Sequence, residues 1–229
     1  MQLNSGAIGR LAILAVMAAI GRTAPAADLS GLYIGGDIGR AQIDANNALY
    51  QAELEGSVEG QGSLDFTKAS LSKRHTAWWA DTGYMVWRSV GIDLSYFHFG
   101  QLSNQVSGSY TPVQGSKEGV YAATSLSSAG PALGVLVRLP LLENFDVDLR
   151  LADYYGRTRL TNAVIAASAS TAKETANSSS LLLGVGAAYT FYGHWSAKLD
   201  YTRVDQAGNS TKVVKYDVDM LSVGVNYTF

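Results

Sequence analysis

Charged side chains recur at alternate positions in several stretches of this sequence that otherwise alternate between apolar and small polar residues. In a β-strand such a spacing places the charges on one face, opposite the apolar side chains. Acidic and basic groups gathered on one face could transfer protons, conduct ions or form a packed network of ion pairs. The candidate residues are Asp37, Asp81, Asp93, Asp148, Arg150, Lys198 and Asp200.

Three other spacings resemble those of chemical sites but lack essential parts. His194 and Ser196 stand two residues apart, the spacing of a base and a nucleophile on one face of a strand, but no orienting acid is visible beside them. His75 and His98 have no second ligand at a metal-binding spacing. The Gly184–Gly186 stretch lacks the third glycine and the following helix of a nucleotide-binding loop. We therefore expect no catalytic, cofactor or metal site.

The composition narrows the class of protein. The 229 residues include 17 basic and 19 acidic side chains, a net charge of -2, which gives no electrostatic reason to expect a nucleic-acid partner. Cysteine is absent, so disulfides and thiolate chemistry are excluded. With 24 Gly and 13 Tyr but only 4 Pro, the composition favours strands rich in aromatic residues.

Residues 1–26 have the pattern of a secretory signal peptide. Arg10 ends a short positive region, residues 11–20 are apolar without interruption, and Ala24-Pro25-Ala26 is an A-x-A cleavage site. Ten apolar residues span only about 15 Å as a helix, about half of a bilayer core, so a retained anchor is the weaker interpretation. We predict cleavage after Ala26, with Ala27 as the alternative, and an exported mature chain of residues 27–229.

Eight alternating stretches follow, most of them as long as the ~10 residues that a tilted membrane strand requires. They are residues 31–41, 76–87, 90–102, 124–139, 145–157, 180–191, 195–205 and 218–229. Three connections are tight (88–89, 140–144 and 192–194), and four are long and polar (42–75, 103–123, 158–179 and 206–217). Short turns at one end and long loops at the other are typical of an outer-membrane barrel.

The direction of the alternation supports a membrane barrel. The apolar parity would face outward, while the other parity holds most of the in-strand charge, including Arg138; a soluble barrel would reverse this arrangement. The charge that does not fit is Asp153, on the outward parity, which we place near the outer interface. The sequence therefore predicts an all-β fold, an eight-stranded antiparallel up-and-down transmembrane β-barrel. The outward residues are Leu32, Ile34, Ile38, Ile92, Leu94, Tyr96, Leu133, Val135, Val137, Leu139, Val147, Leu149, Leu151, Leu183, Val185, Tyr189, Phe191, Leu199 and Tyr201.

Three segments resemble the OmpA-type transmembrane domain and related small surface-antigen barrels of Gram-negative bacteria. Residues 32–39 (LYIGGDIG) resemble the opening strand, Gly83-Tyr84 followed by residues 90–96 (VGIDLSY) resembles the next hairpin, and residues 220–229 (MLSVGVNYTF) resemble the closing strand. The resemblance implies that Asp93, Arg150, Lys198 and Asp200 belong to a polar network in the barrel lumen. It departs from the family pattern at Leu136 and Ala188, where the family often has a lumen base and a lumen acid.

The resemblance also implies a role for the closing strand. In this family the terminal aromatic strand is recognised by the barrel-assembly machinery, which makes Tyr227 and Phe229 the candidate assembly signal. The alternation itself indicates that Phe229 faces lipid at an interface.

The expected function is structural and surface-directed, in the bacterial outer membrane. We expect a barrel that stabilises the envelope, contacts outer-membrane lipid and lipopolysaccharide, and presents its loops to host or phage ligands. The first alternative is a narrow passive channel for ions or small solutes, because the interior carries charge. A less favoured alternative is a lipid-modifying enzyme, since outer-membrane lipid A deacylases use a His-x-Ser pair; here, however, His194 and Ser196 fall at a periplasmic turn.

Overall fold

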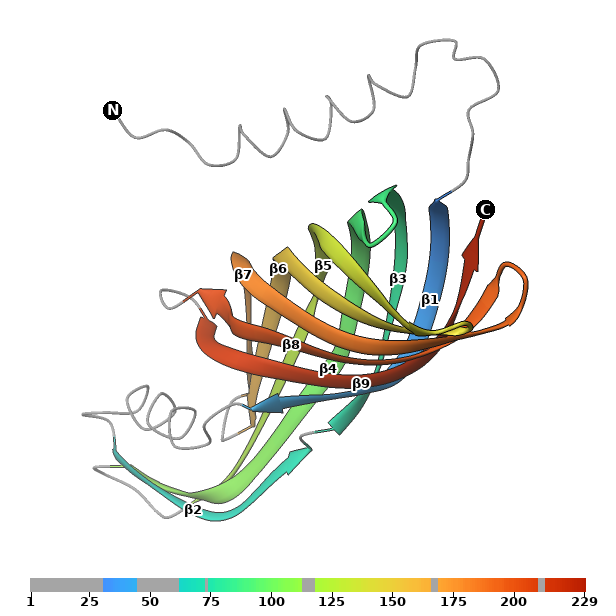
Figure 1. The fold of residues 1–229 in the computed structure, drawn as a ribbon. Helices are drawn as coiled ribbons and strands as arrows, with labels where there is room; N and C mark the ends of the chain where they lie inside the picture. Colours follow the sequence, from blue (N-terminus) through green and yellow to red (C-terminus); the bar gives the residue numbers. More distant parts are fainter. Residues whose placement is uncertain (1–30, 45–61, 73, 113–117, 166–168, 210–212) are drawn as a thin grey trace, which may run out of the picture. The chain divides into compact units, whose positions relative to one another are not determined.

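The chain forms a closed antiparallel β-barrel in the computed structural model, which describes residues 31–44, 62–72, 74–112, 118–165, 169–209 and 213–229 (Figure 1). The strands are β1 (Leu32–Asp44), β2 (Gly62–Ser72), β3 (Arg74–Trp87), β4 (Val90–Pro112), β5 (Glu118–Leu142), β6 (Phe145–Ile165), β7 (Ala169–Tyr192), β8 (Trp195–Asn209) and β9 (Val213–Thr228). Their order is β2-β4-β3-β1-β9-β8-β7-β6-β5, and an additional β4–β5 pairing closes the sheet. The predicted fold class is therefore confirmed. The predicted signal peptide lies outside the described residues and stays a prediction.

Strand β2 was not predicted, because its residues fall within the expected long loop 42–75. It pairs with the far part of β4, from Gly62 opposite Pro112 to Ser72 opposite Ser103. The near part of β4 pairs instead with β3, from Trp87 opposite Val90 to Trp78 opposite His98. Strands β2 and β3 thus pair with successive parts of the same strand, β4, and together take one place in the ring. The closed ring therefore still contains eight strands. Figure 1 shows β2 beside β4 at the end of the barrel opposite the short turns.

The other long loops are also shorter than predicted, because the strands continue into them. Strand β5 has 25 residues and β7 has 24, against 16 and 12 in the predicted stretches. At ~3.3 Å per residue, 25 residues extend about 80 Å, whereas roughly 10 tilted residues cross a bilayer. The added residues are mainly Ser, Thr, Asn, Ala and Gly, whose polar or small side chains on both faces hide the strand periodicity.

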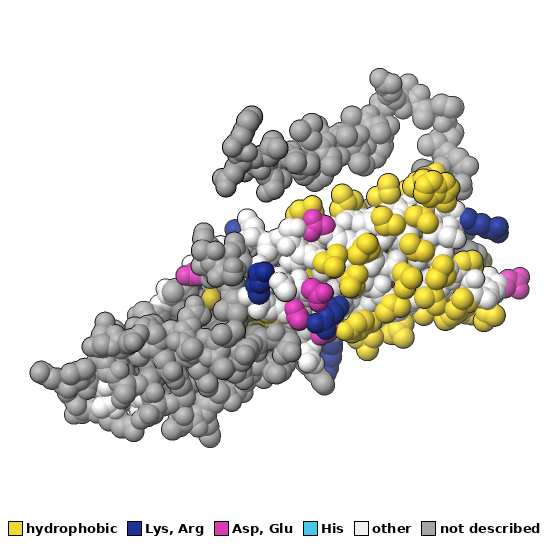
Figure 2. All heavy atoms as spheres, turned by 60° about the vertical axis from the view of Figure 1, so that its left-hand side comes forward, with side chains coloured by type: hydrophobic (Ala, Val, Ile, Leu, Met, Phe, Trp, Pro, Cys, Tyr) yellow, Lys and Arg dark blue, Asp and Glu magenta, His cyan; other side chains and the backbone are white. Residues whose placement is uncertain are grey.

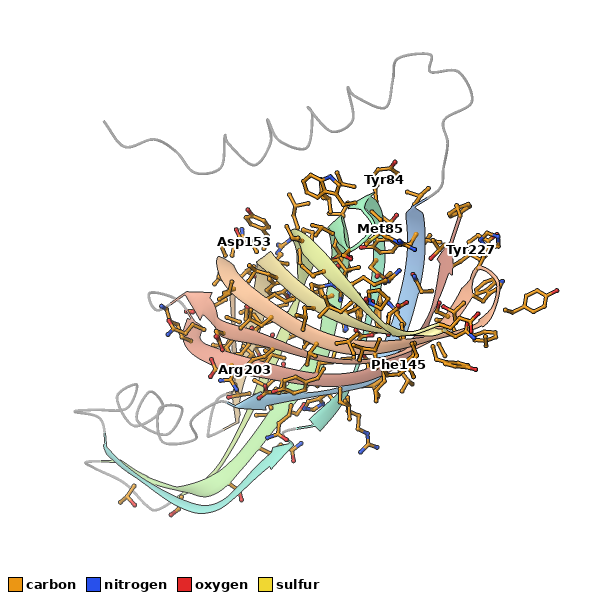
Figure 3. The ribbon with its side chains drawn as sticks, viewed as in Figure 1. Tyr84, Met85, Phe145, Asp153, Arg203 and Tyr227 are labelled. Carbon is orange, nitrogen blue, oxygen red and sulfur yellow. The ribbon has the colours of Figure 1, made fainter. Side chains whose placement is uncertain are left out.

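The outer surface of the barrel carries an apolar band near the short turns. All the residues predicted to face outward are at least partly exposed, among them Ile38 (59%), Leu151 (54%) and Leu199 (50%). Figure 2 shows a field of apolar side chains with charged side chains at its margins. Aromatic side chains gather at the turn end; in Figure 3, Tyr84, Phe145 and Tyr227 lie toward that end, while Asp153 and Arg203 lie toward the other. Within the described residues, no helix is long and apolar enough to cross a membrane.

The interior is divided into two layers along the barrel. Near the short turns is a charged layer, made of Asp37, Asp81, Asp93, Arg138, Asp148, Arg150, Lys198 and Asp200. Farther from the turns is an apolar layer, made of Ile43, Trp79, Phe97, Phe99, Leu102, Leu126, Tyr154, Leu160, Leu182, Val204, Val218 and Met220, none of them more than 3% exposed. The alternation therefore buries charge on one side of this boundary and hydrocarbon on the other.

Candidate functional site: the charged interior of the barrel

Arg150 on β6 bridges two acidic side chains, one on β3 and one on β4, which are paired with each other. Its Nη2 lies 3.3 Å from Asp81 Oδ2, and its Nε lies 3.1 Å from Asp93 Oδ1. Asp93 also accepts hydrogen bonds from the Tyr33 hydroxyl, at 2.8 Å, and from Ser95 Oγ. Asp93 is fully buried, and a buried carboxylate requires such partners to offset its lost hydration. These contacts join β1, β3, β4 and β6 across the interior.

Lys198 on β8 provides the second cationic centre. Its Nζ lies 3.0 Å from Asp37 Oδ2 and 3.4 Å from Asp81 Oδ1, so Asp81 is shared between Lys198 and Arg150. Both cations also lie over the ring of Trp79, with Arg150 Cζ at 4.1 Å and Lys198 Nζ at 4.4 Å from its centroid. The shared carboxylate and the shared ring make one connected network.

A third ion pair lies closest to the short turns. Arg138 contacts Asp148 with two parallel bonds, Nε to Oδ1 at 2.9 Å and Nη2 to Oδ2 at 3.0 Å. This bidentate geometry is the strongest form of an arginine–carboxylate contact. Asp200 is as buried as the other acidic residues, at 7% exposed, but it differs from them because none of the ion pairs among the described residues includes it.

Glycines make room for this network. A Cβ built on Gly224 would overlap the carboxylate of Asp37, and one built on Gly186 would overlap that of Asp200. On Gly35 a Cβ would overlap Asp81 and would lie 3.1 Å from Lys198 Nζ. Asp37, Asp81 and Asp200 therefore occupy the space that a larger residue on the adjacent strand would fill. The charged layer is packed with side chains, as expected for the narrow interior of eight strands.

Aromatic rings fill the apolar layer directly beyond the charges. Trp79 stacks on Phe97 with ring centroids 5.1 Å apart, and Phe97 stacks on Phe99 at 5.5 Å. The ring of Tyr154 meets Phe99 edge-on at 5.4 Å, and its hydroxyl lies 3.0 Å from Ser128 Oγ. An ion that enters this layer loses hydration, and the hydroxyls buried there, among them Ser128, Thr158 and Tyr216, are already hydrogen-bonded to one another or to Tyr154. The apolar layer is thus a barrier on the path from the charged layer to the outer end.

The structure places all seven predicted lumen residues inside the barrel, each at most 7% exposed. Six take part in ion pairs, and Asp200 does not. The lumen site predicted from the sequence did not include Tyr33 or Trp79. The Tyr33 hydroxyl donates to Asp93, and the Trp79 ring lies beneath Arg150 and Lys198. The inward parity of Tyr33 and Trp79 is the sequence signal for a place in the lumen, but neither side chain carries a charge that would point to an ion network. Leu136 and Ala188 are also buried, at 2% and 3% exposure.

The end of β9 is fixed between its two neighbours in the ring. Phe229 N donates to Leu32 O, and Thr228 N donates to His194 O, both at 2.9 Å. The ring of Tyr227 lies 4.9 Å from Phe229 and 5.0 Å from Trp195 between centroids. Phe229 remains 44% exposed. The two candidate assembly residues therefore belong to one aromatic cluster at the junction where β1 and β9 close the barrel.

His194 and Ser196, the alternative catalytic pair, each form a hydrogen bond with a residue outside the pair. Ser196 Oγ lies 2.9 Å from Thr190 Oγ1, and His194 Nδ1 lies 2.6 Å from Thr228 O. His98 Nδ1 accepts from Gly100 N at 3.2 Å, and its ring stacks on Trp78. Across the described part of the chain, His, Asp and Glu form no group of three or more that could hold a metal ion.

A closed barrel with an outward apolar band, aromatic residues at the turn end and a charged interior is an outer-membrane β-barrel. The chain belongs to the OmpA-like transmembrane domain family, which matches residues 27–229. That match begins at the residue after the predicted cleavage site.

Several solved structures are similar to this chain at low sequence identity. Neisserial surface protein A is 14% identical, covers 87% of this chain and 98% of its own, and has a TM-score of 0.42. Ail, the attachment invasion locus protein of Yersinia pestis, is 14% identical, with 87% and 99% coverage and a TM-score of 0.39. The outer membrane protease OmpT of Escherichia coli is 9% identical, with 90% and 99% coverage and a TM-score of 0.45. No curated protein matches the chain.

Proposed function

We propose that this outer-membrane protein is a non-enzymatic, non-conducting barrel. It stabilises the envelope and presents its long outer strands and loops to lipopolysaccharide and to host or phage ligands. The observation that carries this proposal is the two-layer interior. The charged layer is held by ion pairs and packed against glycines, and Trp79, Phe97 and Phe99 fill the space beyond it. A rigid closed interior suits a structural role better than transport.

A narrow passive channel is the second candidate. It is favoured by the charge balance of the charged layer, where five aspartates face three basic residues and Asp200 has no cation in ion-pair contact. A surplus of carboxylates would attract cations into the interior. The apolar layer opposes this function, because a cation would have to cross it without its hydration shell.

Conductance across planar bilayers separates the two functions. The refolded wild-type protein should give no discrete current steps, whereas the double variant Phe97→Ala/Phe99→Ala should conduct if the apolar layer is the barrier. Steps of similar size in both proteins would support the channel. In cells, loss of the protein should increase sensitivity to detergents, and a plasmid copy of the wild type should restore resistance.

We also propose that the barrel-assembly machinery recognises the strand that carries Tyr227 and Phe229. The exposed ring of Phe229 and its aromatic contact with Tyr227 at the β1–β9 junction support this role. The signal peptide would deliver the chain to the periplasm, where this strand is first available.

A further inference from the structure

A groove lies on the outer surface of β5, β6 and β7, at the margin of the apolar band. It is lined by Leu133, Leu151, Ala152, Asp153, Ser179, Ser180 and Leu181 and has a volume of about 340 Å³. Its three leucines are 40–54% exposed, so the walls are apolar and open to the surroundings of the barrel. At one position in the groove Ser179 Oγ donates to Asp153 Oδ1 at 2.5 Å. The groove therefore combines hydrocarbon walls with one carboxylate.

Two exposed arginines follow on the same face of β6. Arg157 and Arg159 continue the outward parity of Asp153, away from the short turns. Arg157 is four residues from Asp153, about 13 Å along the strand. Among the described residues neither arginine forms an ion pair. On β8, by contrast, Arg203 is within 3.5 Å of three aspartates: Asp205, Asp217 and Asp219. Unlike Arg203, Arg157 and Arg159 therefore have no carboxylate partner among the described residues that would compete with an external anion.

We infer that the groove and this arginine pair form a binding site for the lipid A portion of lipopolysaccharide. An acyl chain would lie against Leu133, Leu151 and Leu181, and a phosphate would bind Arg157 and Arg159. The carboxylate of Asp153 would accept hydrogen bonds from the hydroxyl or amide N–H groups of the acylated sugar. The inference rests on the proposed surface-directed function and assigns one of its partners to defined residues.

The order of chemical groups along β6 favours lipid A over a phospholipid. On the outward face of β6 the apolar Leu149 and Leu151 come first, then the acceptor Asp153, then the exposed Tyr155, and then the two cations. Lipid A presents acyl chains, then donor hydroxyl and amide groups, and then phosphates on its sugars. A phosphatidylglycerol offers a single phosphate directly above its ester-linked chains and has no amide donor at that depth. The site also lies at the end of the band opposite the short turns, where the outer leaflet is found.

Native mass spectrometry of the refolded barrel in detergent tests this site, with purified lipid A as the probe. Wild-type protein should retain lipid A. The double variant Arg157→Gln/Arg159→Gln should bind about tenfold more weakly or worse, because it loses charge-assisted bonds to phosphate. Asp153→Asn should weaken binding less, and dephosphorylated lipid A should bind the wild type and the double variant equally. Arg203→Gln is the matched control, because its cation is already neutralised, and it should bind like the wild type.

Three results would overturn the inference: equal lipid A binding by wild type and the double variant, an equal loss in Arg203→Gln, or equal retention of phosphatidylglycerol by the wild type. Heat-dependent migration on gels and planar-bilayer conductance of the same samples keep the two proposals apart. A folded, non-conducting barrel that fails to bind lipid A contradicts the lipid site alone. A conducting barrel that binds lipid A contradicts the proposed closed interior alone.

Discussion

The guanidinium carbon of Arg150 lies 4.1 Å from the centroid of the Trp79 ring, at the level where the charged layer meets the apolar layer. The indole thus faces a cation with one part of its surface and stacks on Phe97 with another. Its Nε1 donates to Ser222 Oγ at 3.1 Å, so its polar atom is also satisfied. Trp79 is therefore the side chain that connects the ion network to the hydrocarbon packing.

Removing this indole should destabilise the barrel strongly. Trp79→Ala leaves a cavity between the layers and removes two cation–π contacts, which predicts a loss of about 3–5 kcal/mol in the free energy of unfolding. The neighbouring Trp78 is the matched control, since it is 44% exposed on the outer surface. Urea unfolding in lipid vesicles should give a much lower midpoint for Trp79→Ala than for Trp78→Ala. Equal midpoints would show that the boundary between the layers contributes little.

The ion network predicts a partner-dependent effect at Lys198. Lys198→Met leaves Asp37 and Asp81 buried with one cation fewer, which should cost about 3–5 kcal/mol of stability. Adding Asp37→Asn removes the carboxylate that lies nearest to the lost ammonium. The double variant Lys198→Met/Asp37→Asn should therefore be more stable than Lys198→Met alone in the same urea titration. If it is less stable, Lys198 acts through packing and not through its charge.

The lipid-facing surface can be tested within one strand. Val135 is 42% exposed in the apolar band on β5, and Ser127 shares its outward parity eight residues farther from the turn. Val135→Arg should lose about 2–4 kcal/mol if it lies near the bilayer midplane, whereas Ser127→Arg should change stability little. Unfolding in vesicles measures both. A tolerated Val135→Arg would mean that the apolar band does not face hydrocarbon.

The alternation of residues such as Val135 made the barrel predictable, because lipid on one side and a narrow interior on the other require opposite side-chain classes. The apolar layer was harder to predict. In the run Tyr96 to Phe99, aromatic rings occupy both parities; the parity that turns Tyr96 outward turns Phe97 and Phe99 inward, but spacing alone does not show that their rings stack into one layer. Strand β2 was missed because its residues, GSLDFTKASLS, do not keep a regular alternation of apolar and polar side chains. The pairing of Arg150 with Asp81 and Asp93 depends on strand register and could not be read from spacing.

The aromatic cluster at the β1–β9 junction supports the last prediction, which concerns assembly. Phe229→Ala removes one partly exposed ring, and even complete burial of a Phe side chain contributes only about 1.5–3 kcal/mol. A barrel whose strands are otherwise paired should survive that loss. Recognition of β9 by an assembly receptor would be far more sensitive, because it depends on the aromatic ring itself. Phe229→Ala should therefore lower the amount of folded protein in the outer membrane of cells much more than it lowers the urea midpoint in vesicles.

Two further variants make that comparison specific. Phe191→Ala removes an aromatic ring of similar exposure, 56% against 44%, from the turn end of β7, away from the β1–β9 junction. Phe229→Tyr keeps a ring at the terminal position. If Phe229 is an assembly signal, Phe191→Ala and Phe229→Tyr should reach the outer membrane at nearly wild-type levels, while Phe229→Ala should not. Equal losses for Phe191→Ala and Phe229→Ala would assign both rings to the interfacial girdle, because a girdle residue contributes through burial wherever it stands on the barrel.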